Sequence, residues 1–223
     1  MTAAEVRAFD LFAGMGEDDA ADLGSRIQVH RAVRGDFLFR QGEAALWLVL
    51  LMGGQVKMER TAADGAVTIV EILGPGSALA AANFLEREPY PVTAVALSDV
   101  VYGALSYADF ERCVRTHPDV ALALLRYMVR RVHRAYAAMR LPARAGVRLA
   151  AALVRIAADA PRRADGLPEV ALAHADLAEV AGMARETVTR HLRRWQAQGL
   201  VDCGLRSIAV RDLEALRRLA EEA

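Results

Sequence analysis

Three charged side chains on one short segment have the chemistry needed to read the edges of DNA bases. They are Arg185, Glu186 and Arg190. A guanidinium can donate two hydrogen bonds to O6 and N7 of guanine, and a carboxylate can accept one from N4 of cytosine. Val188 and Leu192 recur at a helical step in the same segment and would face inward, which leaves the charged residues outside. The pattern predicts a helix whose polar face fits the major groove of DNA.

A second short helix is predicted directly before this one. Leu177, Val180 and Ala181 mark its inner face, and Gly182 stands where the turn between two helices needs a left-handed backbone. Residues 198–210 then have the pattern of a strand, a turn and a second strand, which is a wing. An ordinary amphipathic helix with a solvated Arg-rich face would explain the charged residues alone. The order of helix, glycine turn, helix and wing favours DNA binding.

The charge of the chain is compatible with that function. Its 28 Lys and Arg residues balance 28 Asp and Glu residues, so the formal net charge is zero and there is no overall basic field. Neutralisation of DNA phosphates is local and needs only a local basic stripe. A neutral chain with such a stripe is not expected to bind random DNA tightly.

The segment Arg-Glu-Thr-Val-Thr-Arg at 185–190 resembles the recognition helix R-E-T-V-x-R of the CRP/FNR superfamily of bacterial transcription regulators, and the whole chain resembles that superfamily. The resemblance implies that Arg185, Glu186 and Arg190 read bases, in a half-site similar to TGTGA rather than the TTGAT of FNR-type proteins. Two residues depart from the family pattern. Ala184 stands where a Ser or Thr cap is common, and Ala175 replaces a polar residue that commonly touches phosphate. Phosphate contacts are therefore expected from His174, Thr187, Thr189 and Arg206.

The N-terminal half has the pattern of an antiparallel sheet. Glycine turns separate several of the short β-like runs, which are expected at 27–33, 37–40, 46–52, 55–60, 67–72, 92–96 and 100–105. Segments 39–43, 50–56 and 74–76 resemble the cyclic-nucleotide-binding β-roll. The fold class expected is α+β, with an N-terminal antiparallel β-roll, a long dimerisation helix and a C-terminal winged helix-turn-helix.

The effector pocket implied by this resemblance departs from the cyclic AMP type. Relatives that bind cyclic AMP carry a Gly-Glu pair for the ribose and an Arg-Ser pair for the phosphate. Those positions here are Ala80-Ala81 and Tyr90-Pro91, and the spacing of Arg87 is wrong for a substitute. Because burying a phosphate without a cation is costly, cyclic AMP is not expected as the effector. The pocket is predicted to be apolar and lined by Leu79, Ala80, Ala81, Phe84, Tyr90 and Met128.

The segment 84–97 resembles the DNR/NNR branch of the superfamily, whose members respond to nitric oxide and for which heme is the proposed cofactor. The resemblance makes heme a candidate cofactor here, with His133 and His30 as candidate axial ligands. Another small apolar or gaseous effector, or none, remains an alternative. Arg185 conflicts with this branch, whose members mostly favour FNR-like sites.

Residues 119–141 contain neither Gly nor Pro and are predicted to form one long helix. Apolar residues recur along it at steps of three and four, which is typical of a coiled-coil seam. The predicted dimer seam is Leu122, Leu125, Val129, Val132, Tyr136 and Met139, while Leu124, Met128 and Ala135 form a second stripe. A parallel homodimer implies a palindromic site with half-sites about one helical turn apart. Pro142 is the expected hinge. The expected domains are 1–117, 118–141 and 142–223.

The remaining features exclude other classes. Cys113 and Cys203 predict no disulfide framework, fit a cytoplasmic protein and cannot supply the four thiolates of an iron–sulfur cluster. The chain shows no signal peptide and no apolar run long enough to span a membrane. RNA polymerase is a candidate further partner. The alternatives are an effector-independent DNA-binding protein, a winged helix that binds protein, and a metal-dependent cupin-type enzyme. The last needs clustered His ligands, and residues 27–105 hold only His30.

Overall fold

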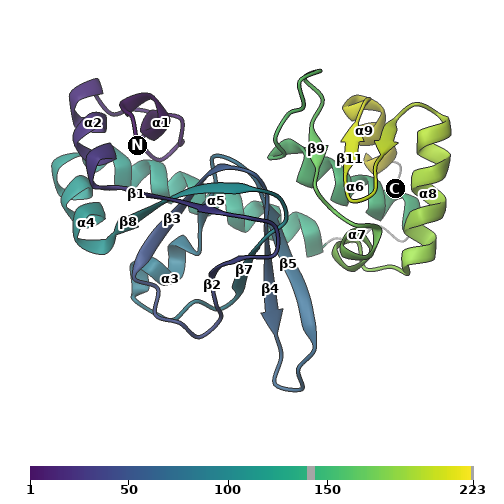
Figure 1. Cartoon of the computed structure of the whole chain (residues 1–223), viewed down its shortest axis with the longest axis horizontal. Coiled ribbons are helices and arrows are strands. Elements are labelled where there is room, and N and C mark those ends of the chain that lie inside the picture. Colours follow the sequence, from purple (N-terminus) through teal and green to yellow (C-terminus); the bar gives the residue numbers. More distant parts are fainter. Residues whose placement is uncertain (140–143, 222–223) are drawn as a thin grey trace.

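The structure is a computed structural model that describes residues 1–139 and 144–221, with the backbone alone for 134–139. A β-roll and its covering helices lie at one end, and a mostly helical part lies at the other (Figure 1). The long helix α5 (Pro118–Met139) runs behind the roll toward the helical part. The predicted hinge at Pro142 lies outside the described residues, as do the side chains of the seam positions Tyr136 and Met139.

The roll consists of two four-stranded antiparallel sheets, in the orders β1-β8-β3-β6 and β2-β7-β4-β5. The strands are β1 (Gln28–Ala32), β2 (Phe37–Phe39), β3 (Trp47–Gly53), β4 (Val56–Thr61), β5 (Val67–Leu73), β6 (Ala78–Leu79), β7 (Thr93–Ala96) and β8 (Val100–Ser106). The hairpin of β4 and β5 projects from the body of the molecule (Figure 1). The structure confirms the predicted antiparallel roll and adds the short strand β6.

The sequence of strand β3 is apolar throughout, and its position in the roll explains this. Successive side chains of a strand point to opposite faces. Leu48 and Leu50 join a core beneath the helices, whereas Val49 and Leu51 join the core between the two sheets. Both faces of β3 are therefore buried, which removes the polar alternation expected of a strand with one face in water.

Helices cover one face of the roll. They are α1 (Ala3–Arg7), α2 (Glu17–Arg26), α3 (Ala81–Glu86) and α4 (Tyr107–Thr116), together with α5. At the start of α4, the Ser106 hydroxyl accepts a hydrogen bond from the Asp109 backbone N–H at 3.1 Å, which is an N-terminal cap. Pro118 occupies the first position of α5, where its missing N–H removes no helical hydrogen bond.

Helix α5 has two apolar faces with different surroundings. Val120, Leu124 and Tyr127 are buried against the roll. The Tyr127 hydroxyl accepts a hydrogen bond from the Ala78 N–H at 3.2 Å and donates one to the Ala78 carbonyl at 2.9 Å. The other face is open to solvent, with exposed fractions of 46% at Leu122, 59% at Leu125, 46% at Val129 and 51% at Val132.

The C-terminal part is a winged helix-turn-helix. Its elements are α6 (Ala145–Ala158), β9 (Glu169–Val170), α7 (His174–Val180), α8 (Arg185–Ala197), β10 (Val201–Cys203), β11 (Ile208–Val210) and α9 (Leu213–Glu221). Gly182 has a φ of +61°, as the predicted turn between α7 and α8 requires. Strands β10 and β11 pair in antiparallel fashion and form the wing.

The core of the C-terminal part extends into the roll. Ile69, Ile72 and Leu97 of the roll belong to the same buried apolar cluster as Leu177 and Leu192 of the helix-turn-helix. Helix α7 therefore packs beside β5, while α8 lies at the edge of the molecule away from the roll (Figure 1). Within residues 1–139 and 144–221, no helix combines the length and apolar character needed to cross a membrane.

Candidate DNA interface and effector pocket

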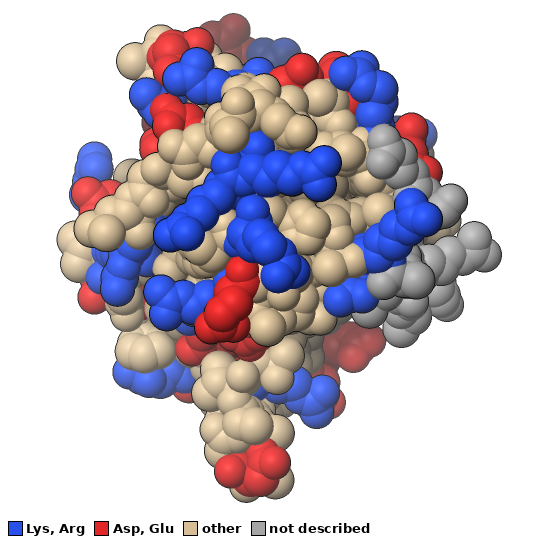
Figure 2. Space-filling view, turned by 90° about the vertical axis from the view of Figure 1, so that its right-hand side faces the viewer, with Lys and Arg blue, Asp and Glu red and all other residues tan. Residues whose placement is uncertain are grey.

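Helix α8 separates its apolar and charged side chains as the sequence predicts. Val188, Leu192 and Trp195 are buried on its inner face. The outer face carries a shallow recess of about 500 Å³, lined by Arg185, Glu186, Thr189, Arg190 and Arg193. Figure 2 shows Lys and Arg side chains across the middle of the face on which α8 lies, with few Asp and Glu side chains among them. This arrangement can present donors and one acceptor together to a groove of DNA.

Arg193 is the recess residue that the sequence prediction did not include among the candidate contacts. It lies four residues after Thr189 and eight after Arg185, so helical periodicity places it on the same face. The spacing was sufficient to find it. The recess therefore holds three guanidinium groups, of Arg185, Arg190 and Arg193, beside the single carboxylate of Glu186.

The predicted phosphate-contact residues lie in two places. His174 begins α7 and Thr189 lies on α8, and His174 Nδ1 is 3.0 Å from Thr189 Oγ1, so this pair joins the two helices. Thr187 is half-buried in the first turn of α8. Arg206 is separate from them, exposed in the wing turn between β10 and β11, where the neighbouring Leu205 has an exposed fraction of 99%.

Two histidines of the helix-turn-helix are held toward the neutral form. The pKa of His174 lies below its usual value because of partial burial and the positive charges of Arg185 and Arg193. The pKa of His191 is lowered by burial and by Arg190 and Arg194. The arginines of α8 therefore disfavour a positive charge on both rings.

The start of α8 carries no side-chain cap from the described residues, because Ala184 has no side-chain oxygen. This agrees with the departure from the family pattern noted in the sequence. The α7 start differs, since the Asp176 carboxylate accepts a hydrogen bond from the Ala173 N–H at 3.2 Å.

A small pocket of about 180 Å³ lies between the roll and α5, where the effector site was expected. Ala80, Ala81 and Met128 line it, as predicted. Three other residues predicted to line it instead lie in the core, with Leu79 and Phe84 fully buried. Tyr90 is also buried and stacks on Phe39 with ring centroids 3.9 Å apart. These side chains are large and apolar, and packing between the sheets and under the helices buries them better than a pocket wall would.

The pocket is not apolar, which corrects the sequence-based expectation. Glu71 of β5 and Arg131 of α5 both line it, and their side chains form a hydrogen-bonded ion pair. Arg131 also donates to the Tyr127 hydroxyl at 3.3 Å. Burial by itself would lower the pKa of Arg131, but the interactions with Glu71 and Tyr127 together more than offset this, so the pKa is raised. The carboxylate and the guanidinium are present, but each already has the other as its partner.

The lining residues do not fit heme. Within the described residues, none of those that line the pocket is a histidine. The candidate ligand His133 is exposed, and His30 lies on β1, exposed and stacked on Tyr102 at a centroid distance of 5.2 Å. The volume also lies below the roughly 300–1,000 Å³ typical of pockets for drug-sized ligands. Across residues 1–139 and 144–221, no three His, Cys, Asp or Glu side chains cluster closely enough to hold a metal ion.

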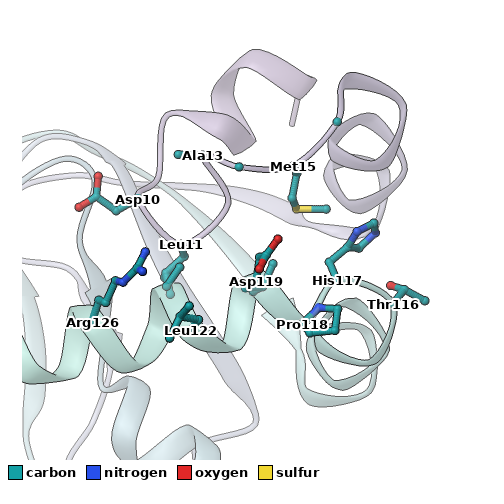
Figure 3. Close-up of a pocket in the computed structure, with 14 residues that line it drawn as sticks. Asp10, Leu11, Ala13, Met15, Thr116, His117, Pro118, Asp119, Leu122 and Arg126 are labelled. Atoms are coloured by element: carbon teal, nitrogen blue, oxygen red, sulfur yellow. The ribbon is translucent and has the colours of Figure 1, made fainter.

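A larger cavity of about 560 Å³ lies between the α1–α2 loop and the start of α5 (Figure 3). Asp10 and Arg126 lie at one end, His117 lies at the other, and Asp119 lies between them (Figure 3). The charges are of both signs, and Asp10 is paired with Arg130 at 2.9 Å. The cavity also reaches Leu122 of the exposed face of α5.

Comparisons with known proteins agree with both halves of the fold. Residues 29–117 match the family model of the cyclic nucleotide-binding domain, and residues 147–219 match that of the Crp-like helix-turn-helix domain. The chain is 30% identical over 212 residues to the cyclic AMP receptor protein of Thermus thermophilus, covering 94% of this chain and 96% of the relative. It is 25% identical to the CRP-like cAMP-activated global transcriptional regulator of Mycobacterium tuberculosis, again over 94% and 96%.

The solved structures give the same result. The catabolite activator protein of Thermus thermophilus has 28% sequence identity to this chain and a TM-score of 0.53, over 95% of this chain and 98% of that one. No branch of the family is specified by these matches, so the resemblance to DNR/NNR regulators stays a prediction.

Proposed function

Because the chain belongs to the CRP/FNR superfamily of DNA-binding transcription regulators, we propose that two copies pair through α5 and bind an inverted repeat. The exposed apolar stripe of Leu122, Leu125, Val129 and Val132 carries this proposal. Water around four neighbouring apolar side chains is unfavourable, and a second copy of the same stripe would remove them from it. Since α5 is long and the stripe is continuous, parallel pairing gives a two-fold axis along the helix.

The recess on α8 supports a role in base reading. Arg185, Glu186 and Arg190 would contact base edges, and Arg193 would extend the row of donors. His174, Thr187, Thr189 and Arg206 would contact phosphates. Their positions on α7, α8 and the wing allow them to reach the backbone on both sides of the groove. The resemblance of the helix to R-E-T-V-x-R favours a TGTGA-like half-site.

A small effector other than cyclic AMP would control this activity from the pocket between the roll and α5. Both of the relatives described above are named for cyclic AMP. In this chain Arg131 is paired with Glu71, and the pocket is about 180 Å³, so a cyclic nucleotide would have to break the ion pair and enlarge the site. An effector shifts the regulator only by binding its two conformations with different affinity.

The same ion pair favours a second candidate, a regulator that needs no effector. Glu71 supplies an internal anion for Arg131, so the pocket wall is complete without a ligand. Protein purified without additives then binds its DNA site at full affinity. Addition of cyclic AMP leaves the dissociation constant unchanged under both candidates, and a tightening by cyclic AMP would contradict both.

Selection from randomised duplexes tests the proposed function directly. The expected product is an inverted repeat with half-sites about one helical turn apart, bound by a complex with the mass of two chains and one duplex. Recovery of a single unpaired half-site would exclude the homodimer. Recovery of no consensus at all would exclude sequence-specific binding.

A further inference from the structure

Polar contacts attach the DNA-binding part to the roll. They join the two parts, and neither part needs them for its own internal packing. The Gln55 side chain has an exposed fraction of 0%, and its Oε1 accepts a hydrogen bond from the Ala171 N–H at 2.5 Å. The Ile69 N–H donates to Glu179 Oε1 on α7, also at 2.5 Å. These bonds join residues more than a hundred positions apart in the chain.

Without the contact between the two parts, the groups of the roll that form these bonds would lack a partner. Strand β5 is the edge strand of its sheet, so its outward N–H groups have no neighbouring strand, and Glu179 takes one of them. Gln55 is a buried polar residue, and its Nε2 has no hydrogen-bond partner among the described residues. Its one side-chain bond is the one to the DNA-binding part, so the interior of the roll alone gives no reason for an amide there.

Gly74 makes the fit at this contact specific. A Cβ built on Gly74 would lie 1.4 Å from the Asp159 carbonyl oxygen at the end of α6, a distance at which backbone atoms must move apart. Ile72 and Leu97 of the roll also belong to one buried apolar cluster with residues of the helix-turn-helix. The two surfaces therefore meet backbone to backbone, in a position that any side chain at residue 74 would prevent.

The roll in turn is fixed to α5. The Tyr127 hydroxyl bonds both backbone groups of Ala78, and Leu124 is buried beside it. A helix-turn-helix held on the roll is therefore also held relative to α5, and so relative to the two-fold axis of a dimer paired through α5. The distance and angle between the two α8 helices then depend on this contact.

We propose that Gln55, Gly74 and Glu179 are positioning residues that set the spacing of half-sites this regulator accepts. The inference rests on the proposed homodimer. None of the three lines the recess on α8, so they act on where α8 sits and not on which bases it reads. Base preference and spacing preference are thereby controlled by different residues, α8 for the first and the contact between the parts for the second.

The test measures affinity of the full chain for inverted repeats of the selected half-site whose spacer is changed in single base-pair steps. Wild-type protein is expected to discriminate about 10-fold or more against a spacer altered by half a helical turn, about 5 base pairs. Gly74→Ala and Glu179→Ala are each expected to reduce that discrimination to about 3-fold or less while leaving affinity for one half-site unchanged. Glu179→Ala does not depend on tolerance of a backbone clash, so it keeps the test valid if Gly74→Ala folds poorly.

Matched controls separate this role from general damage. Gly53→Ala adds the same atom where nothing lies within 4 Å, and Glu214→Ala removes an exposed helical carboxylate that pairs within α9. Both should keep the wild-type spacing preference. Arg185→Ala should relax the half-site sequence and keep the spacing. If Glu179→Ala retains wild-type discrimination, the positioning role is wrong although the homodimer stands. If wild-type protein shows no preferred spacing, the proposed homodimeric site is wrong as well.

Discussion

Arg185 is exposed in the first turn of α8 and lines the recess, so its guanidinium is free to reach a base. Arg185→Ala is expected to cost about 1–3 kcal/mol of binding free energy and to relax specificity at one base pair. Competition with duplexes that carry each single-base change measures both effects. Arg206→Ala is the matched comparison. If Arg206 contacts phosphate as proposed, Arg206→Ala should lower affinity equally for all sequences and reduce the slope of log affinity against log salt by about 1. Equal losses on all duplexes for Arg185→Ala would show that it contacts phosphate only.

His174 gives a pH dependence whose sign follows from its surroundings. Its pKa is lowered in the folded protein by burial and by Arg185 and Arg193, so the folded state disfavours the protonated ring. The unfolded chain therefore takes up the proton more readily, and stability is full above the unfolded pKa of about 6.5 and falls as pH drops below it. Unfolding in urea at pH 7.5 and pH 5.5 measures the loss.

The variant His174→Asn removes this titration and should flatten part of the pH dependence. His191 shifts in the same direction, so His191→Asn should flatten a further part. His117→Asn is the control, since that ring lies outside the helix-turn-helix and faces Asp19 at 3.7 Å. An unchanged pH profile in the double variant would contradict the assignment to His174 and His191.

At the scale of the element, α5 has a second apolar face that the described part of the chain leaves exposed. Leu125→Asp places a carboxylate in the middle of the stripe, where pairing would bury it without a cation. The dimer dissociation constant is expected to rise by about 100-fold or more, as measured by sedimentation. Val33→Asp is the control, because Val33 is another exposed apolar residue, outside α5. A dimer that survives Leu125→Asp with unchanged affinity would place the interface elsewhere.

Strand β5 and helix α5 meet at the Glu71–Arg131 ion pair. Glu71→Gln leaves Arg131 half-buried with its charge unpaired, which should destabilise the chain by about 1–3 kcal/mol in urea unfolding. Glu111→Gln is the control, since Glu111 pairs with Arg115 on the surface and such pairs contribute about 0–1 kcal/mol. Equal effects of both variants would mean that the pair at the pocket is no stronger than a surface pair.

The elements predicted best from the sequence are those with a clear period or a clear turn. The long strands, α5 and the helix-turn-helix follow from apolar spacing and from Gly182. Helix α3 gave no such signal. It is short and is flanked by Ala80 and Arg87 in the left-handed region, with φ of 49° and 56°, residues that do not indicate a helix boundary. Its backbone is set by packing of Phe84 beneath it, which is a tertiary effect.

At the scale of the whole molecule, zero net charge and a local row of guanidinium groups predict weak binding to random DNA and tighter binding to a specific site. Affinity for the selected site is expected to exceed that for random DNA by about 10³-fold or more at physiological salt. Random DNA should bind with a dissociation constant of about 10⁻⁴–10⁻⁶ M. Titration of both duplexes at several salt concentrations checks this. A ratio near one would show that the recess reads only backbone.

The contacts between distant parts of the chain could not be predicted from the sequence. Glu71 and Arg131 are 60 residues apart, and Gln55 and Ala171 are 116 apart. No local period connects such pairs, and the apolar residues of a predicted pocket are indistinguishable from those of a core. The sequence therefore placed the candidate base-reading side chains on one helix, but it indicated neither the charged pair of the pocket nor the contact between that helix-turn-helix and the roll.

The double hydrogen bond between Tyr127 and Ala78 has one more consequence. If α5 slides or rotates by even part of a turn, the hydrogen bond from the Ala78 N–H to the Tyr127 hydroxyl must break. The rate of hydrogen–deuterium exchange at the Ala78 amide therefore reports the position of α5 relative to the roll. A change in that exchange rate on addition of DNA would show that the contact between α5 and the roll responds to DNA binding.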